Sequence, residues 1–228
     1  MERIHELLAL RDRSPVFRDR VHAGEVLAGM LAEFRRSDAV VLAIPAGGVP
    51  VAAEVATRLD LPLHLAVVSK ILLPWTTELG YGAVAWDGTI WMNEADAREY
   101  RLTEQQITRG TAEAMQKVRR RYARLRGRHP MPALVDRTAI LVDDGIAAGS
   151  TMRTAIMALR KLGAQRLAVA VPTGHEWSLR AIAALVDAVY CANVRGGLGL
   201  AVAEAYEAWT DVSEDEVAAI LRRLTPPQ

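Results

Sequence analysis

The stretch that decides the fold is AILVDDGIAAGST, residues 139–151. Its apolar start predicts a buried strand, and the small residues after the two acids end in Gly-Ser-Thr, which can begin a helix. Ligands of parallel α/β sheets bind at the carboxyl ends of strands, where Asp143 and Asp144 would lie. Loop amides and a helix N-terminus attract phosphate, whereas carboxylates accept hydrogen bonds from a sugar diol. The two features are compatible if one ligand carries both groups, as ribose 5-phosphate does.

A plainer interpretation of this stretch is an ordinary turn, because Asp-Asp often follows a strand and Gly-Ser-Thr often caps a helix. The complete order of strand, acids, small loop and helix favours the ligand site. Other phosphate, nucleophile and metal motifs are excluded. The loop has no Walker lysine, no G-x-G-x-x-G follows the early strands, and Ser150 lies in AGSTM instead of a nucleophile elbow. No Cys/His spacing fits structural zinc.

The chain around this stretch alternates strand and helix patterns, which predicts an α/β fold with a Rossmann-like parallel sheet of about five strands flanked by helices. We expect strands at 39–44, 63–68, 139–142, 167–171 and 188–191, and helices at 21–36, 51–59, 103–126, 150–162, 178–185 and 213–224. The insertion at about 71–130 breaks the rhythm. It contains a predicted hairpin around Asp87-Gly88 and is expected to form a lid over the binding edge of a single domain, 1–228.

Composition sets broad limits on function. The 228 residues carry a net charge of +1 and are 51% hydrophobic, so no global field favours nucleic acid or membrane surfaces. A single cysteine, Cys191, excludes an internal disulfide and is expected to be a buried apolar residue. No apolar run reaches the length of a membrane span, and the charged N-terminus lacks a signal-peptide core. We therefore expect a cytoplasmic protein.

VDDGIAAGST closely resembles the phosphoribosyl pyrophosphate (PRPP) motif of type I phosphoribosyltransferases. Other stretches, FRDRVHAGEVLAGML (17–31), IPAGGVPVA (44–52), SKILLPWTTELGYGAVAWDG (69–88) and YEAWTDVSEDEV (206–217), resemble an uncharacterised bacterial branch of that family. The resemblance implies transfer of a 5-phosphoribosyl group from PRPP to a nucleobase-like acceptor, with release of pyrophosphate. It also implies Mg²⁺ as cofactor and a homodimer.

The resemblance assigns roles residue by residue. Asp143 and Asp144 would hold the ribose hydroxyls, partly through Mg²⁺, and form the catalytic set with Lys70, which would face pyrophosphate. A lysine leaving a strand can equally be merely solvated. The 5-phosphate loop would comprise Gly145, Ile146, Ala147, Ala148, Gly149, Ser150 and Thr151.

The turn after the first expected strand matches the pyrophosphate-binding loop, with Ala46, Gly47 and Gly48 in contact with the leaving group. The two glycines suit a backbone that approaches phosphate closely, although plain turn chemistry is the alternative. Three alanines depart from the family pattern. Relatives commonly carry Arg at Ala46, the hypoxanthine–guanine branch has a third acid at Ala147, and many relatives have Thr at Ala148. The motif therefore favours ribose-phosphate binding more than any particular base chemistry.

The acceptor would lie near the loop after the fourth strand, where His175 and Trp177 could contact or stack on a base. The alternative is that Trp177 packs at a helix start and His175 is solvated. Trp75, Tyr81 and Trp86 of the insertion could close over the site or, more commonly for aromatic residues, pack a core.

A basic helix supports a rival function. Met115, Val118, Tyr122 and Leu125 form its apolar stripe, and its cations are Lys117, Arg120, Arg121, Arg124 and Arg128. Such faces are usually solvated. Some proteins of the phosphoribosyltransferase fold are regulators that sense PRPP and bind nucleic acid, which residues 117–128 could do. The near-zero net charge makes nucleic-acid binding the less favoured interpretation.

Overall fold

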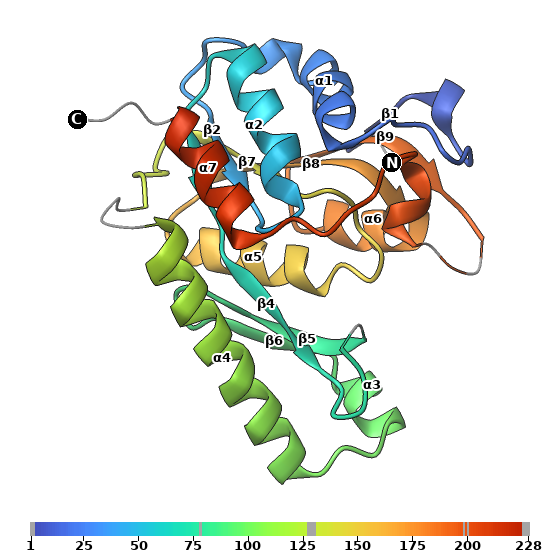
Figure 1. Cartoon of the computed structure of the whole chain (residues 1–228), viewed down its shortest axis with the longest axis vertical. Helices are drawn as coiled ribbons and strands as arrows, with labels where there is room; N and C mark the ends of the chain where they lie inside the picture. The colour runs from blue at the N-terminus through green and yellow to red at the C-terminus, as the bar shows by residue number, and fades with distance from the viewer. Residues whose placement is uncertain (1–2, 78, 127–130, 198, 200, 225–228) are drawn as a thin grey trace.

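A parallel six-stranded sheet forms the centre of the protein in the computed structural model, which describes residues 3–77, 79–126, 131–197, 199 and 201–224 (Figure 1). Its strand order is β1-β9-β8-β7-β2-β3, and every neighbouring pair is parallel. The strands are β1 (Ile4–Glu6), β2 (Val40–Ala43), β3 (Leu63–Leu65), β7 (Thr138–Val142), β8 (Arg166–His175) and β9 (Ala188–Arg195). The α/β prediction is confirmed. The expected five strands become six because β1, too short to show a hydrophobic period, pairs with β9.

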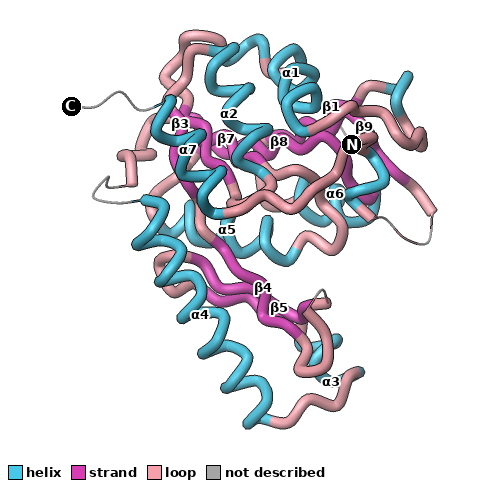
Figure 2. Tube along the Cα trace, viewed as in Figure 1, coloured by secondary structure: helices cyan, strands magenta, loops and turns pink. Residues whose placement is uncertain are grey.

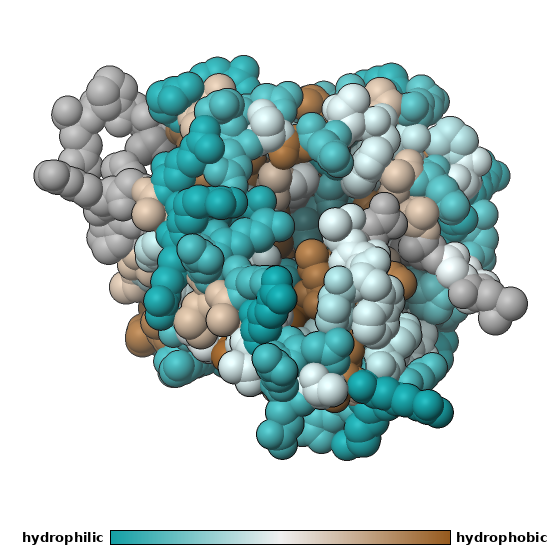
Figure 3. Space-filling model, turned by 60° about the horizontal axis from the view of Figure 1, so that its bottom comes forward, coloured by the Kyte–Doolittle hydropathy of each residue, from teal (hydrophilic) through white to brown (hydrophobic). Residues whose placement is uncertain are grey.

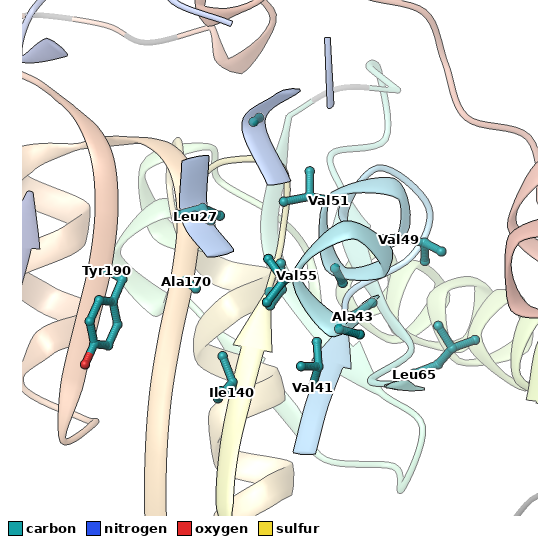
Figure 4. Close-up of a cluster of buried hydrophobic side chains, with 14 of the residues drawn as sticks. Leu27, Val41, Ala43, Val49, Val51, Val55, Leu65, Ile140, Ala170 and Tyr190 are labelled. Carbon is teal, nitrogen blue, oxygen red and sulfur yellow. The ribbon is translucent and has the colours of Figure 1, made fainter. Parts of the chain in front are cut away.

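Both faces of the sheet are buried, since alternate residues of the four inner strands, β2, β7, β8 and β9, enter two separate apolar clusters. In β2, Val41 and Ala43 belong to the cluster under α1 (Arg20–Met30) and α2 (Gly48–Leu59). Val40 and Leu42 belong to the cluster under α5 (Ser150–Lys161) and α6 (Glu176–Ala183). Figure 4 shows the first cluster, with Val55 of α2 placed above the strands. This two-sided burial explains why the strands are continuous apolar runs.

The chain order makes a topological switch point between β2 and β7, which are neighbours in the sheet. From β2 the chain crosses through α2 to β3 at the edge of the sheet. From β7 it crosses through α5 to β8, in the opposite direction. In open α/β sheets such a point leaves a crevice beyond the strand ends, and ligands bind there.

The insertion forms a second layer of structure that projects below the main sheet in Figures 1 and 2. An antiparallel sheet joins β4 (Val68–Leu72), β5 (Gly80–Ala85) and β6 (Ile90–Met92), and α3 (Glu94–Glu99) leads to the long α4 (Glu104–Arg126). The sheet is enclosed by α4 on one side and α5 on the other. The hairpin around Asp87-Gly88 is confirmed, and Gly88 has the positive φ of a tight turn, 87°.

The expected strand at 63–68 is wrong in one respect. Its residues divide between β3, which ends at Leu65, and β4, which begins at Val68 and pairs with the insertion instead of the main sheet. The apolar run does not reveal this change of partner, because residues 65–68 are all buried across the point of division.

Two helices begin with the capping residues expected from the sequence. Thr103 and Gln106 form a reciprocal capping box at the start of α4, and Ser213 and Glu216 do so at α7 (Glu214–Leu224). The helix expected at 21–36 is shorter, since α1 ends at Met30 and a separate 3-10 turn follows. No helix in the described part of the chain is both long and apolar enough to cross a membrane.

Candidate functional site

The two loops singled out in the sequence meet at the switch point around one cavity of about 500 Å³. The turn Pro45–Gly47 follows β2, and residues 143–151 follow β7. Lys70 of β4 closes the cavity from the insertion. The fold thus gathers Asp143, Asp144, the small loop, Ala46, Gly47 and Lys70 at one place. Figure 3 shows a mostly hydrophilic face of the molecule with hydrophobic surface in its hollowed centre.

The two acids occupy a shielded position. Asp143 Oδ1 accepts the amide of Asp144 at 2.9 Å. Burial and the neighbouring Asp144 carboxylate raise the pKa of Asp143 well above its usual value. Burial also raises the pKa of Asp144, although the adjacent Arg20 guanidinium opposes the effect. The pair therefore holds negative charge that its surroundings compensate only in part, which suits a ligand with hydroxyl donors or a cation.

Close packing of the two loops depends on Gly47 and Gly48. A Cβ at Gly47 would lie 1.9 Å from Asp144 Oδ2, and a Cβ at Gly48 would lie 2.8 Å from Asp143 Cα. Gly47 has ordinary helical angles, φ −60° and ψ −33°, so conformational freedom does not explain it. These glycines let the turn pack directly against the two acids. The sequence alone indicates only that the turn could approach a phosphate.

The small loop divides into a fixed start and a helix terminus. The Ile146 amide donates to Thr173 O at 3.0 Å and its side chain is buried, so this residue ties the loop to β8. Ala147 and Ala148 are exposed, and Gly149, at φ 81°, turns the chain into α5. The first amides of α5 have no acceptor within the helix and adjoin the cavity. The donors for an anion are thus the residues after Ile146.

Lys117 and Arg121 also line the cavity, a role that cannot be inferred when α4 is taken as a surface helix. Their spacing of four residues places them on one face, but only the tertiary structure shows that this face turns toward the acids. Burial, followed by the charges of Arg121 and Arg120, lowers the pKa of Lys117. A second hollow of about 500 Å³ lies between β4 and α4 and shares Lys70 and Lys117 with the first.

Two cations of the basic helix form ion pairs with α7. Arg121 Nε lies 3.2 Å from Glu214, and Arg124 lies 3.1 Å from Glu214 and 2.7 Å from Asp215, both in the first turn of α7. Arg128 falls outside the described residues. These ion pairs weigh against a nucleic-acid surface on this helix, because they compensate the charges of Arg121 and Arg124.

His175 and Trp177 do not line the cavity. His175 caps α6: Nδ1 accepts the Trp177 amide at 3.2 Å, and Nε2 lies 2.9 Å from Gly197 O, which makes Nε2 the protonated nitrogen. The Trp177 side chain is 71% exposed. Their assignment to base binding stays a prediction, and the structure itself gives His175 a capping role.

The aromatic residues of the insertion have different surroundings. Tyr81 is fully buried and Trp86 packs against both apolar clusters, so these two serve the core. Trp75 is 60% exposed, with Tyr100 as an edge-on neighbour. The cavity takes Leu79 from this region instead of a tryptophan.

Arg20 is a further residue of the site that the sequence pattern does not reveal. Its guanidinium lies 2.9 Å from Asp144 Oδ2 and is almost fully buried. The stretch around it is recognisable only as part of a family resemblance, and a lone arginine at a helix start carries no signal for a contact with a residue 124 positions away.

The chain is similar to known proteins in sequence and in structure. Two curated proteins of Mycobacterium tuberculosis strains, each named "Putative phosphoribosyl transferase", are 38% identical to the chain over 209 residues, which is 91% of the chain and 47% of theirs. The crystal structure of TT1426 from Thermus thermophilus is 33% identical, with a TM-score of 0.74, and the match covers 92% of this chain and 100% of that one. No family model matches. The chain spans about half the length of the curated relatives.

Proposed function

The chain belongs to the type I phosphoribosyltransferase family, and on that premise we propose that it transfers the 5-phosphoribosyl group of PRPP to a nucleobase-like acceptor. The observation that carries this proposal is the single cavity in which Asp143 and Asp144 lie beside the start of α5 and the turn Pro45–Gly47. A ribose bearing phosphate at one end and pyrophosphate at the other requires these three surfaces together.

Each surface has a task in the proposed reaction. The amides after Ile146 bind the 5-phosphate, and the two acids accept the ribose hydroxyls. The turn and Lys70, with Lys117, face the pyrophosphate. The bond from C1 to the pyrophosphate oxygen breaks, with the electron pair leaving on that oxygen. An acceptor ring nitrogen then bonds to C1 and gives up its proton. Positioning and charge stabilisation supply the rate increase.

Asp143 and Asp144 also fit Mg²⁺. This ion is usually held by one or two carboxylates together with substrate phosphates, and the pair provides hard oxygen donors whose shared charge is poorly compensated. Within the described residues no cluster of three or more metal-binding side chains exists, so phosphate would complete the coordination. When bound, the ion would neutralise charge on the leaving pyrophosphate.

Titration calorimetry with PRPP and Mg²⁺ tests the binding step. We expect Asp143→Asn to weaken PRPP binding about 10- to 100-fold, the value of a charge-assisted hydrogen bond. Asp60→Asn is the matched control, since Asp60 ends α2 far from the cavity and its side chain is 75% exposed. The proposal would be overturned if folded wild-type protein did not bind PRPP, or if Asp143→Asn bound PRPP with wild-type affinity.

Turnover separates the enzyme from a PRPP sensor. Pyrophosphate release is measured with a broad panel of nucleobases, and we expect at least one to react. Binding of PRPP without turnover across the panel would exclude the transferase and leave the regulator. Sedimentation analysis tests the homodimer that we expect from the family.

A further inference from the structure

Arg20, at the start of α1, is committed to several partners at once. The residue is only 8% exposed. Nε and Nη2 lie 3.0 and 2.9 Å from the same oxygen, Asp144 Oδ2, and Nη1 donates to Thr210 O at 2.8 Å. Each guanidinium nitrogen therefore has an acceptor inside the protein, which fixes the orientation of the Arg20 side chain.

The support for Arg20 comes from a wall built from both ends of the chain, residues 16–20 and 205–210. Backbone bonds join the two segments: the Phe17 amide donates to Ala205 O at 2.9 Å, and the Ala208 amide donates to Arg18 O at 2.8 Å. The Arg20 guanidinium lies 3.8 Å from the centre of the Trp209 ring. Stacking on an indole adds to the ion pair and fixes the plane of the guanidinium.

The same wall holds the backbone of Asp144. The Tyr206 hydroxyl donates to Asp144 O at 2.6 Å. Arg20 thus binds the side chain of Asp144 and Tyr206 binds its carbonyl, while Gly47 lies against the same carboxylate. Asp143 has no such clamp: its Oδ1 accepts a local bond from the Asp144 amide.

We propose that Arg20 is a positioning residue that holds the Asp144 carboxylate, through Oδ2, in the orientation that receives the ribose of PRPP. Trp209 and Tyr206 act with it, so the N-terminal and C-terminal segments jointly set the geometry of the acid pair. The inference rests on the proposed function for the identity of the ligand. It assigns a role to the stretches 17–31 and 206–217, which the acid and phosphate loops leave without one.

Three substitutions test the role. Arg20→Gln removes the charge and the fork, and we expect PRPP affinity and kcat/KM to fall about 10- to 100-fold, as when the partner of a ligand residue is lost. Arg20→Lys keeps a charge that can reach Oδ2 but not the fork geometry, so an intermediate loss is expected. Arg18→Gln is the control, because Arg18 carries the same charge two positions away and its side chain is 64% exposed. It should bind PRPP as the wild type does.

Tyr206→Phe provides a test that does not disturb the buried charge. It removes one hydroxyl and should weaken PRPP binding about 2- to 10-fold, the worth of one hydrogen bond. If Arg20→Gln does not fold, Tyr206→Phe still tests the positioning role. Unchanged PRPP affinity in both Tyr206→Phe and Arg20→Lys would overturn the inference.

A structural readout separates this inference from the proposed function. In a crystal structure of Arg20→Gln, or of Tyr206→Phe if the former does not fold, we expect the Asp144 side chain or its carbonyl to shift. If both keep the wild-type position, the positioning role is refuted, whatever the ligand is. Wild-type protein that fails to bind PRPP refutes the proposed function instead, and the displacement of Asp144 still tests the clamp.

Discussion

Replacing Gly47 with alanine tests how tightly the two loops are fitted. The new Cβ would lie 1.9 Å from Asp144 Oδ2, whereas Cβ contacts under 3.0 Å are essentially never found, so the carboxylate must retreat by about 1.1 Å. Arg20 cannot simply follow, because Thr210 O and the Trp209 ring hold it. We expect a loss of about 1–3 kcal/mol of unfolding free energy from overpacking. A displacement of about 1 Å in a binding group also predicts an activity loss of about 100-fold.

Thermal or urea unfolding measures the first effect, with about 2–4 °C expected per kcal/mol for a chain of this size. Gly29→Ala is the matched control. Gly29 lies in α1, and a Cβ added there would meet no atom within 4 Å, so alanine should add up to about 1 kcal/mol through helix propensity. Gly47 has helical backbone angles that alanine can also adopt, so any loss should come from the steric contact alone. If Gly47→Ala left stability and activity unchanged, the close fit of the two loops would not be the reason for glycine at this position.

Four further outcomes are expected. Burial raises the pKa of Asp143, so the folded state favours the protonated carboxyl; this contribution to stability is present below the unfolded pKa and is lost as pH rises through the folded pKa. Asp143→Asn should therefore have a free energy of unfolding about 0.5–2 kcal/mol above that of the wild type. The difference between the two proteins should be larger at pH 8 than at pH 4. Because burial lowers the pKa of Lys117, PRPP affinity should decline with alkaline pH earlier in the wild type than in Lys117→Arg, and identical profiles would deny Lys117 a phosphate contact. Cys191 is buried with a raised thiol pKa, so a thiol reagent should modify it only under unfolding conditions, and rapid modification of native protein would contradict its burial. Nucleic-acid binding at low ionic strength should be absent, because Glu214 pairs with Arg121 and Arg124 of α4; salt-dependent binding would support the regulatory interpretation instead.

The sequence predicted the parts of this fold that have a local period. The strands β2, β7, β8 and β9 are apolar runs buried on both faces, and α4 and α7 begin with capping boxes. Asp143, Asp144 and the small loop were recognisable because strand, acids and helix start are adjacent in the chain. Their convergence with Ala46 and Gly47 followed from the rule that ligands bind at a switch point.

The remainder depends on contacts that are distant in sequence. Arg20 meets Asp144 across 124 residues, and no local pattern distinguishes it from the exposed Arg18. Lys117 was assigned to the correct helix, but the direction of its face is set by the packing of α4 on β4 and β5. Strand β1 is three residues long and has no period of its own.

Helix α5 serves two neighbours. Its first turn borders the candidate phosphate site, and its side supports the small sheet, where Arg153 lies 5.3 Å from the Trp91 ring centre and Lys161 lies 3.5 Å from Asp87. The small sheet of the insertion therefore packs on the helix whose first turn would bind the phosphate. A rigid-body movement of the insertion would have to break its contacts with α5, so we expect the small sheet and the candidate phosphate site to keep a fixed spacing.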